Sequence, residues 1–173
     1  EIRALQQRLG LTVAYVTHDQ SEALAVSDQI VVMDAGRIAQ AGTPQQLYEH
    51  PKSEFVAGFM GEAMLFDGQA RADGSVQLGP LRVQPREPAA PGAVKVAVRP
   101  EAWRLSAGQG LPGAPGLPGM VQKCAYLGSV QELTLDTALG SIFVVSPELE
   151  RPWKLGQAVW LSLAGHGLSV VAT

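Results

Sequence analysis

The feature that most constrains this chain is a change of sequence pattern at Gly61. Before this residue, apolar side chains recur at helical spacing, interrupted by β-rich runs. After it, helical spacing stops, and short apolar runs alternate with Gly, Pro and Asp. A chain of 173 residues is long enough for two small domains. We therefore predict one unit over residues 1–61 and a second over residues 62–173.

The first unit has the pattern of alternating helices and strands. Helical spacing covers residues 2–9, and Gly10 follows as a helix stop. Residues 11–17 form a nearly continuous apolar, β-rich run, which is typical of a strand buried on both faces of a parallel sheet. The rest of the unit is predicted as a helix over 20–27, a hairpin over 30–41, and helices over 43–50 and 53–60.

The second unit has an all-β pattern that predicts a small barrel or sandwich. Within it, residues 110–119 have Gly at every third position and are predicted to form a loop of polyproline-II type. The predicted strands are 66–72, 75–78, 81–84, 94–99, 120–126, 130–137, 141–145, 158–163 and 168–171.

His18 is the candidate functional residue of the first unit. It follows the β-rich run and precedes Asp19, a helix N-cap residue type with Glu22 three positions later. This places His18 on a tight turn between a strand and a helix. A histidine beside a capping Asp is usually structural, so the longer ordered string around it gives the more specific signal. That string comprises Val16–Leu24, Asp34–Arg37 and Ala41–Pro44.

The first sixty or so residues resemble, without a gap, the end of the ATPase domain of ABC importers for sugars, polyamines, sulfate and ferric iron. By that resemblance His18 is the switch histidine, whose imidazole contacts the γ-phosphate of ATP and the attacking water. A neutral imidazole can donate one hydrogen bond and accept another, so it can orient a water molecule while it contacts the phosphate. The resemblance also implies ATP and Mg²⁺ as cofactors of a full-length parent protein.

Segments that bind nucleotide in such proteins are missing from this sequence. No Gly-Lys pair occurs, although a phosphate-binding P-loop requires one. The chain begins at Glu1 inside a helical pattern, so we interpret it as a piece of a longer protein. We therefore expect this chain alone to need no cofactor and to be inactive as an ATPase.

Two segments imitate other ABC motifs, and we reject both. Ile30–Asp34 resembles the strand that ends in the Mg²⁺-associated Asp, but Ala35 replaces the catalytic Glu and the strand follows the histidine instead of preceding it. Leu105–Gln109 resembles the ABC signature, but Gly and Pro residues follow it at once and prevent the helix that the signature needs.

The second unit contains the landmarks of a regulatory module. Phe59–Leu65 resembles the linker that follows such ATPase domains, while Val96–Glu101 and Ala125–Gly128 resemble landmarks of the TOBE module, an OB-like barrel. The predicted fold class is therefore α+β, with a C-terminal α/β remnant of an ABC ATPase domain followed by a mainly-β, OB-like barrel. Arg99 and Glu101 are candidates for a dimer or regulatory contact, and barrel architecture is the alternative explanation for each.

The resemblance implies the ATP-binding, energy-coupling subunit of an ABC importer. Ferric iron is the favoured cargo over sulfate, polyamines, phosphonate and sugars. The implied partners are a second copy of the chain, transmembrane permease subunits and, through them, a periplasmic binding protein. The implied location is cytoplasmic, peripheral on the inner face of the cell membrane. We also expect a homodimer of this chain alone, because an incomplete sheet exposes an apolar patch.

Charge and residue counts limit the other classes of function. Residues 1–64 contain four Lys or Arg against eight Asp or Glu, and residues 65–173 contain nine against eight, so no nucleic-acid partner is predicted. His50 and His166 lack a second ligand at metal-binding spacing, so no metal site is predicted. Cys124 is the single cysteine, which fits a reducing compartment. The alternative function is a stand-alone OB-like module that senses a small anion or metabolite.

Overall fold

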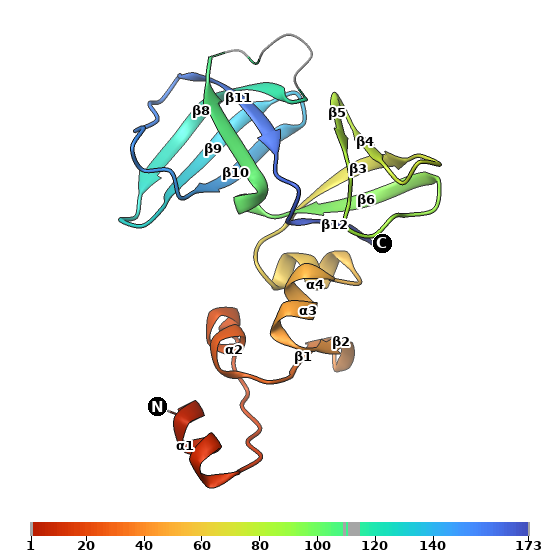
Figure 1. The fold of residues 1–173 in the computed structure, drawn as a ribbon, viewed down its shortest axis with the longest axis vertical. Coiled ribbons are helices and arrows are strands. Elements are labelled where there is room, and N and C mark those ends of the chain that lie inside the picture. Colours follow the sequence, from red (N-terminus) through yellow and green to blue (C-terminus); the bar gives the residue numbers. More distant parts are fainter. Residues whose placement is uncertain (1, 109, 111–114, 173) are drawn as a thin grey trace.

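Short helices and one hairpin occupy the N-terminal third of the molecule, and a β domain occupies the rest (Figure 1). The computed structural model describes residues 2–108, 110 and 115–172. The helices are α1 (Ile2–Leu9), α2 (Gln20–Val26), α3 (Pro44–Glu49) and α4 (Glu54–Phe59). A hairpin of β1 (Ile30–Asp34) and β2 (Arg37–Gly42) lies between α2 and α3 in the sequence.

Side-chain caps set the start of the helices beside the β domain. Thr43 and Gln46 form a reciprocal capping box, in which Thr43 Oγ1 accepts from the Gln46 N–H at 3.2 Å and Gln46 Oε1 accepts from the Thr43 N–H at 2.9 Å. Pro44 occupies the first turn, where its missing N–H removes no helical bond. Ser53 caps α4 through the Val56 N–H. The predicted helix starts are therefore confirmed.

The buried strand predicted over residues 11–17 is wrong for this chain. These residues belong to no helix or strand and are largely exposed, with Val16 at 95%. A central strand needs neighbours on both sides to bond its N–H and C=O groups. Within the part of the chain that the structure describes, no strand pairs with this segment.

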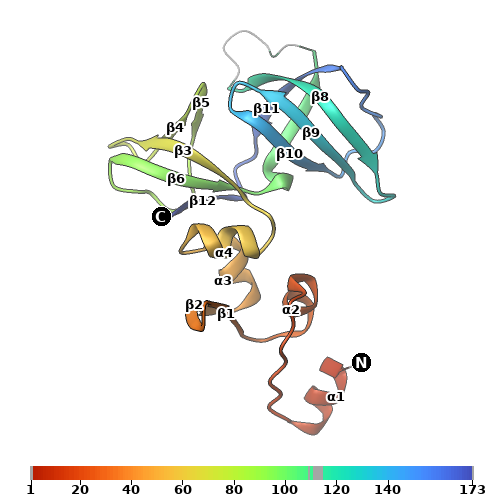
Figure 2. The same ribbon diagram turned by 180° about the vertical axis from the view of Figure 1, so that it is seen from behind.

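The β domain consists of two antiparallel sheets that curl side by side (Figures 1 and 2). One sheet has the order β12-β6-β3-β4-β5 and the other β10-β9-β8-β11-β7. A 3₁₀ turn over Pro100–Ala102 connects β6 to β7, so the chain changes sheet there. The strands are β3 (Met64–Ala70), β4 (Val76–Leu78), β5 (Leu81–Val83), β6 (Gly92–Val98), β7 (Trp103–Ala107), β8 (Leu117–Tyr126), β9 (Gln131–Thr137), β10 (Gly140–Ser146), β11 (Ala158–Leu163) and β12 (Leu168–Val171).

Both sheets contribute to one hydrophobic core. Val96 and Val98 of β6 belong to the same buried cluster as Leu133 of β9 and Leu161 of β11. Trp103 begins β7, directly after the chain changes sheet, and is 1% exposed. Its ring packs edge-on against Phe66 of β3, with 6.0 Å between the ring centres. This shared core accounts for the predicted barrel-like or sandwich-like architecture.

Two features of the β domain differ from the prediction. Trp103–Ala107 forms β7, which the sequence pattern did not reveal. The loop predicted over 110–119 falls partly outside the described residues, and its last part belongs to β8, which begins at Leu117. Pro118 fits this strand because it pairs with Trp160 of β11, whereas pairing with β9 begins only at Gly119.

The C-terminal strand brings the β domain onto the helices. Ala57 of α4 packs in a small buried cluster with Ala97 of β6 and Val171 of β12. After β12, Ala172 forms a parallel bridge with Ser53 and accepts a hydrogen bond from the Glu54 N–H at 3.3 Å. Strands β6 and β12, with Ala172, therefore fix the position of α4. None of the described helices is both long and apolar enough to cross a membrane.

Candidate functional site

His18 lies at an exposed bend directly before α2. Asp19 is the N-cap, and its carboxylate accepts hydrogen bonds from Ser21 N–H at 2.8 Å and Glu22 N–H at 3.1 Å. On the other side of His18, Thr17 Oγ1 accepts from the Asp19 N–H at 2.9 Å. The backbone on both sides of the histidine is therefore fixed by short-range hydrogen bonds, while the imidazole is left facing solvent.

Glu22 makes different contacts from those that the predicted capping box requires. Its carboxylate accepts from Tyr15 Oη at 2.8 Å and Thr17 Oγ1 at 3.1 Å, instead of from the Asp19 N–H. The hydrogen bond to Glu22 is the main reason that the pKa of Tyr15 is raised. Glu22 therefore ties the extended segment before His18 to the helix after it.

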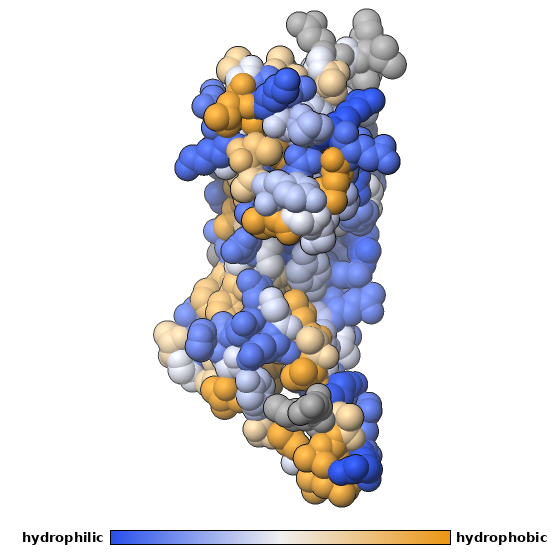
Figure 3. Space-filling view, turned by 90° about the vertical axis from the view of Figure 1, so that its left-hand side faces the viewer, coloured by the Kyte–Doolittle hydropathy of each residue, from blue (hydrophilic) through white to orange (hydrophobic). Residues whose placement is uncertain are grey.

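Apolar side chains are exposed on the segment that precedes His18 and on the hairpin that follows α2. The extended segment exposes Leu11, Val13, Tyr15 and Val16, and the hairpin exposes Val31, Met33 and Ile38. Figure 3 shows apolar residues gathered at the end of the molecule that the N-terminal segment forms. Such a patch on a folded protein marks a surface that another segment or chain covers.

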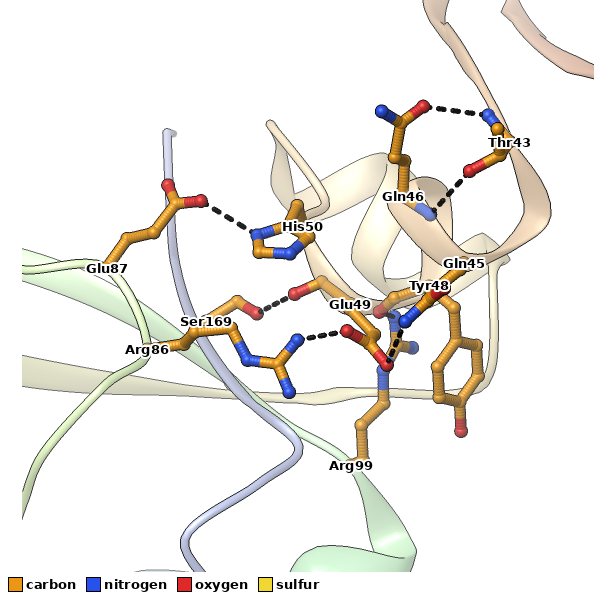
Figure 4. Close-up of polar contacts among 10 residues, drawn as sticks. All are labelled: Thr43, Gln45, Gln46, Tyr48, Glu49, His50, Arg86, Glu87, Arg99 and Ser169. Carbon is orange, nitrogen blue, oxygen red and sulfur yellow. Dashed lines mark hydrogen bonds and ion pairs between the residues drawn. The ribbon is translucent and has the colours of Figure 1, made fainter.

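The second candidate region is the junction between the helices and the β domain, where Arg99 is 3% exposed. Arg99 Nη1 donates to the Ala57 carbonyl at 2.8 Å, and Nη2 donates to the Tyr48 carbonyl at 2.6 Å. The guanidinium also lies over the Tyr48 ring, 4.2 Å from its centre (Figure 4). One side chain of the β domain thus holds the ends of α3 and α4.

Glu101 completes this junction through Tyr48. The Tyr48 hydroxyl donates to Glu101 Oε1 at 2.5 Å. Burial, followed by this hydrogen bond, raises the pKa of Tyr48 to about 12. Burial lowers the pKa of the Arg99 guanidinium, and the nearby Tyr48 and Glu101 oppose that shift. The two candidate residues therefore meet the same tyrosine, Arg99 on its face and Glu101 at its hydroxyl.

More polar contacts join the end of α3 to the β domain (Figure 4). Glu49 forms an ion pair with Arg86, which holds the pKa of the Glu49 carboxyl below its usual range. The Glu49 carbonyl accepts from Ser169 Oγ at 2.9 Å. His50 Nδ1 lies 2.7 Å from Glu87 Oε1. Sequence reasoning selected Arg99 and Glu101 here but missed Tyr48, Glu49 and Arg86, because their pairing depends on contacts distant in sequence.

The rejected ABC signature resembles the motif in letters only. Leu105–Ala107 lies in strand β7, and Gly108 follows at a φ of +81°. Ile30–Asp34, which resembles the strand ending in the Mg²⁺-associated Asp, forms β1 of the hairpin. Ala35 lies in the turn of this hairpin at a φ of +44°. As for metal ligands, no three His, Cys, Asp or Glu side chains converge on one point within the described ranges.

Gly61 allows the junction to close. Its φ is +110°, and a Cβ added there would lie 2.5 Å from Tyr48 Cε2 and 3.0 Å from Arg99 Nη1. We expect Gly61→Ala to lower the free energy of unfolding by about 2 kcal/mol, through backbone strain and displacement of Tyr48. Urea unfolding monitored by circular dichroism measures this loss.

Gly58→Ala is the matched control for that substitution. Gly58 lies inside α4, and an added Cβ there meets nothing within 4 Å. We expect this variant to gain about 0.5–1 kcal/mol, since Ala favours a helix more than Gly does. Equal stability of the two variants would show that the tight fit around Gly61 has no energetic consequence.

The comparisons with known proteins cover both candidate regions. The TOBE domain family matches residues 96–171. The Fe(3+) ions import ATP-binding protein FbpC of Agrobacterium fabrum is 42% identical over 177 residues, which cover 99% of this chain and 49% of the relative. FbpC 1 of Rhizobium meliloti is 45% identical with the same coverage. The chain belongs to the family of ABC-importer ATP-binding subunits.

Other members of this importer family differ in their named cargo. The spermidine/putrescine import ATP-binding protein PotA of Acidothermus cellulolyticus is 37% identical, over 93% of this chain and 45% of its own length. The chain spans about half the length of the curated relatives it matches. The predicted family and α+β fold class are confirmed, and the TOBE match over residues 96–171 includes strands of both curled sheets.

Proposed function

We propose that this chain supplies the C-terminal half of a transport ATPase that drives import of Fe³⁺. The observation that supports this is the match to iron-import ATP-binding proteins over 99% of the chain, through both the His18 turn and the TOBE domain. A stand-alone sensor of a small anion is less well supported, because the similarity also covers the helices before the TOBE domain.

In this proposal His18 acts at the γ-phosphate of ATP. The turn is exposed, and its backbone is fixed by Thr17 and Asp19, so the imidazole can approach a phosphate bound by another part of the protein. Phosphoryl transfer depends mostly on positioning and electrostatics, which is the contribution that a held imidazole makes. ATP and Mg²⁺ are the proposed cofactors, bound mainly by residues outside this chain.

We assign residues 1–61 to the nucleotide-binding domain and residues 62–173 to a regulatory β domain. Exposed apolar side chains on the 11–17 segment and on β1 support this division, since a larger domain would bury them. In the β domain the buried core is shared by both sheets. The apolar surface of residues 1–61 is therefore proposed to pack against the upstream half of the same protein.

The proposed partners follow from the import function of the relatives. Two copies of the full-length protein would bind ATP between them and act on transmembrane permease subunits, which receive cargo from a periplasmic binding protein. The protein would then be peripheral on the cytoplasmic face of the membrane. Arg99 holds the β domain against α3 and α4, so a movement of these helices would be transmitted to the regulatory domain.

Uptake and hydrolysis measurements test this function. The protein extended to its relatives' length is expected to hydrolyse ATP with its permease and to restore Fe³⁺ uptake in a deletion strain, whereas residues 1–173 alone should do neither. Spermidine and putrescine uptake is measured in parallel, because a relative has that cargo in its name. Restored polyamine uptake without iron uptake would overturn the cargo, and absence of any ATP hydrolysis would overturn the class.

A further inference from the structure

Glu22 lies in the first turn of α2 and closes a ring of hydrogen bonds that spans His18. Its backbone N–H donates to Asp19 Oδ1 at 3.1 Å, so the residue is bound to the cap of its own helix. Its carboxylate accepts from Thr17 Oγ1 at 3.1 Å, on the other side of the histidine. Thr17 Oγ1 in turn accepts from the Asp19 N–H at 2.9 Å. The ring therefore holds the chain both before and after His18.

The Thr17 hydroxyl is held from two directions in this ring. A hydroxyl has one proton to donate and lone pairs that accept. Here the proton is donated to Glu22 Oε2, while the oxygen accepts from the Asp19 N–H. Without the carboxylate, the hydroxyl would lose the acceptor that sets the direction of its proton. The geometry of the residue directly before His18 therefore depends on the side chain of Glu22.

Tyr15 attaches this ring to the extended segment before the turn. Its hydroxyl donates to Glu22 Oε2 at 2.8 Å, so one carboxylate oxygen accepts from both Tyr15 and Thr17. Residues 11–17 belong to no helix or strand, and no strand pairs with them in the part of the chain that the structure describes. The two hydrogen bonds to Glu22 therefore join the end of this segment to α2 without the help of a sheet.

We propose that Glu22 is a positioning residue for ATP hydrolysis, which acts by fixing the backbone from which the His18 imidazole projects toward the γ-phosphate. This inference rests on the proposed function of His18, and it assigns Glu22 no contact with ATP. Misplacing a reacting group by roughly 1 Å can lower a rate about 100-fold. An exposed carboxylate that contributes little to folding can therefore have a large effect on kcat.

Steady-state ATP hydrolysis by the full-length protein with its permease tests the proposal. Glu22→Ala is expected to lower kcat about tenfold and to leave KM for ATP within about twofold, because a displaced imidazole affects the reaction more than the binding of ATP. Glu22→Gln should stay within about threefold of the unmodified protein, since an amide oxygen accepts the same two hydrogen bonds. A Gln variant as slow as the Ala variant would overturn the proposal, because the negative charge itself would then be required.

The His18→Ala background separates positioning from a general effect on the fold. If Glu22 acts only through His18, adding Glu22→Ala to His18→Ala should change kcat less than about twofold, since the effects of residues that act as a unit do not add. A further tenfold loss in that background would overturn the proposal. Full activity of Glu22→Ala beside a slow His18→Ala would overturn this inference alone, whereas full activity of His18→Ala would overturn the proposed role of His18 as well.

Glu54→Ala is the matched control for these variants. Glu54 lies in the first turn of α4, as Glu22 lies in the first turn of α2, so both carboxylates have the same relation to a helix N-terminus. Glu54 is remote in sequence from His18, and its loss should leave kcat within about twofold, as for other surface substitutions. Equal losses in Glu22→Ala and Glu54→Ala would overturn the proposal, since a general effect at helix ends would then explain both.

Discussion

Replacing His18 by alanine in the full-length protein is expected to lower kcat for ATP hydrolysis about 100-fold, the lower range for loss of a group that orients and accepts protons from a nucleophile. In its proposed role the His18 imidazole acts on the attacking water and the γ-phosphate during hydrolysis. The affinity for ATP should therefore change little. Steady-state phosphate release measured over a range of ATP concentrations separates kcat from KM.

His50→Ala is the matched control for this experiment. His50 is also a partly exposed histidine, but it contacts Glu87 at the junction and is remote in sequence from the α2 turn. We expect its ATPase activity to remain within about twofold of the unmodified protein, as for a surface substitution of little energetic effect. Equal losses in both variants, or full activity of His18→Ala, would show that His18 has no role in hydrolysis.

The turn at position 18 and helix α2 should stay folded in His18→Ala. The caps of this turn come from Asp19 and Thr17 and do not involve the imidazole. Far-ultraviolet circular dichroism of His18→Ala should therefore match that of the unmodified protein. An activity loss with an unchanged spectrum assigns the effect to the imidazole and not to unfolding of α2.

Local signals predicted most of the helices and strands. Thr43-Pro44 predicted a helix start, and the structure has a full capping box there. The run over residues 11–17 is apolar and β-rich, and the strand predicted from it is wrong, because a strand also needs paired neighbours and the described residues supply none. Strand β7 was missed because its exposed Arg104 and Ser106 and its following Gly108 obscure an apolar pattern.

The candidate site shows the same limit of sequence reasoning. His18 could be selected because its turn and cap are encoded by adjacent residues. Arg99 could be selected only as a landmark, since its partners Ala57 and Tyr48 are 42 and 51 positions away. Nothing in the sequence indicated that a charged side chain at the end of β6 would be buried. Its structural role follows from the packing of α3 and α4 onto the β domain.

Arg99→Met is expected to lower the free energy of unfolding by about 3 kcal/mol. Methionine matches the length of the arginine stem but cannot donate, so the Tyr48 carbonyl loses the bond from Arg99 and the Ala57 carbonyl keeps only the longer bond from the Ala63 N–H at 3.4 Å. An acceptor left buried without its donor costs about 1–3 kcal/mol. The cation–π contact with Tyr48 is lost as well. Urea unfolding followed by tryptophan fluorescence reports this loss, because buried Trp103 lies close to Arg99 in sequence.

Arg82→Met and Arg99→Lys separate burial from charge in this result. Arg82 is half exposed and pairs with Asp73, so its loss should cost less than about 1 kcal/mol. Lysine at position 99 keeps the charge, but a single ammonium lacks the planar fork that reaches two carbonyls, so we expect stability between Arg99→Met and the unmodified protein. If Arg99→Met costs no more than Arg82→Met, the guanidinium does not hold the helices. If the three variants follow the expected order, the fork geometry of Arg99, beyond its charge, fixes α3 and α4 on the β domain.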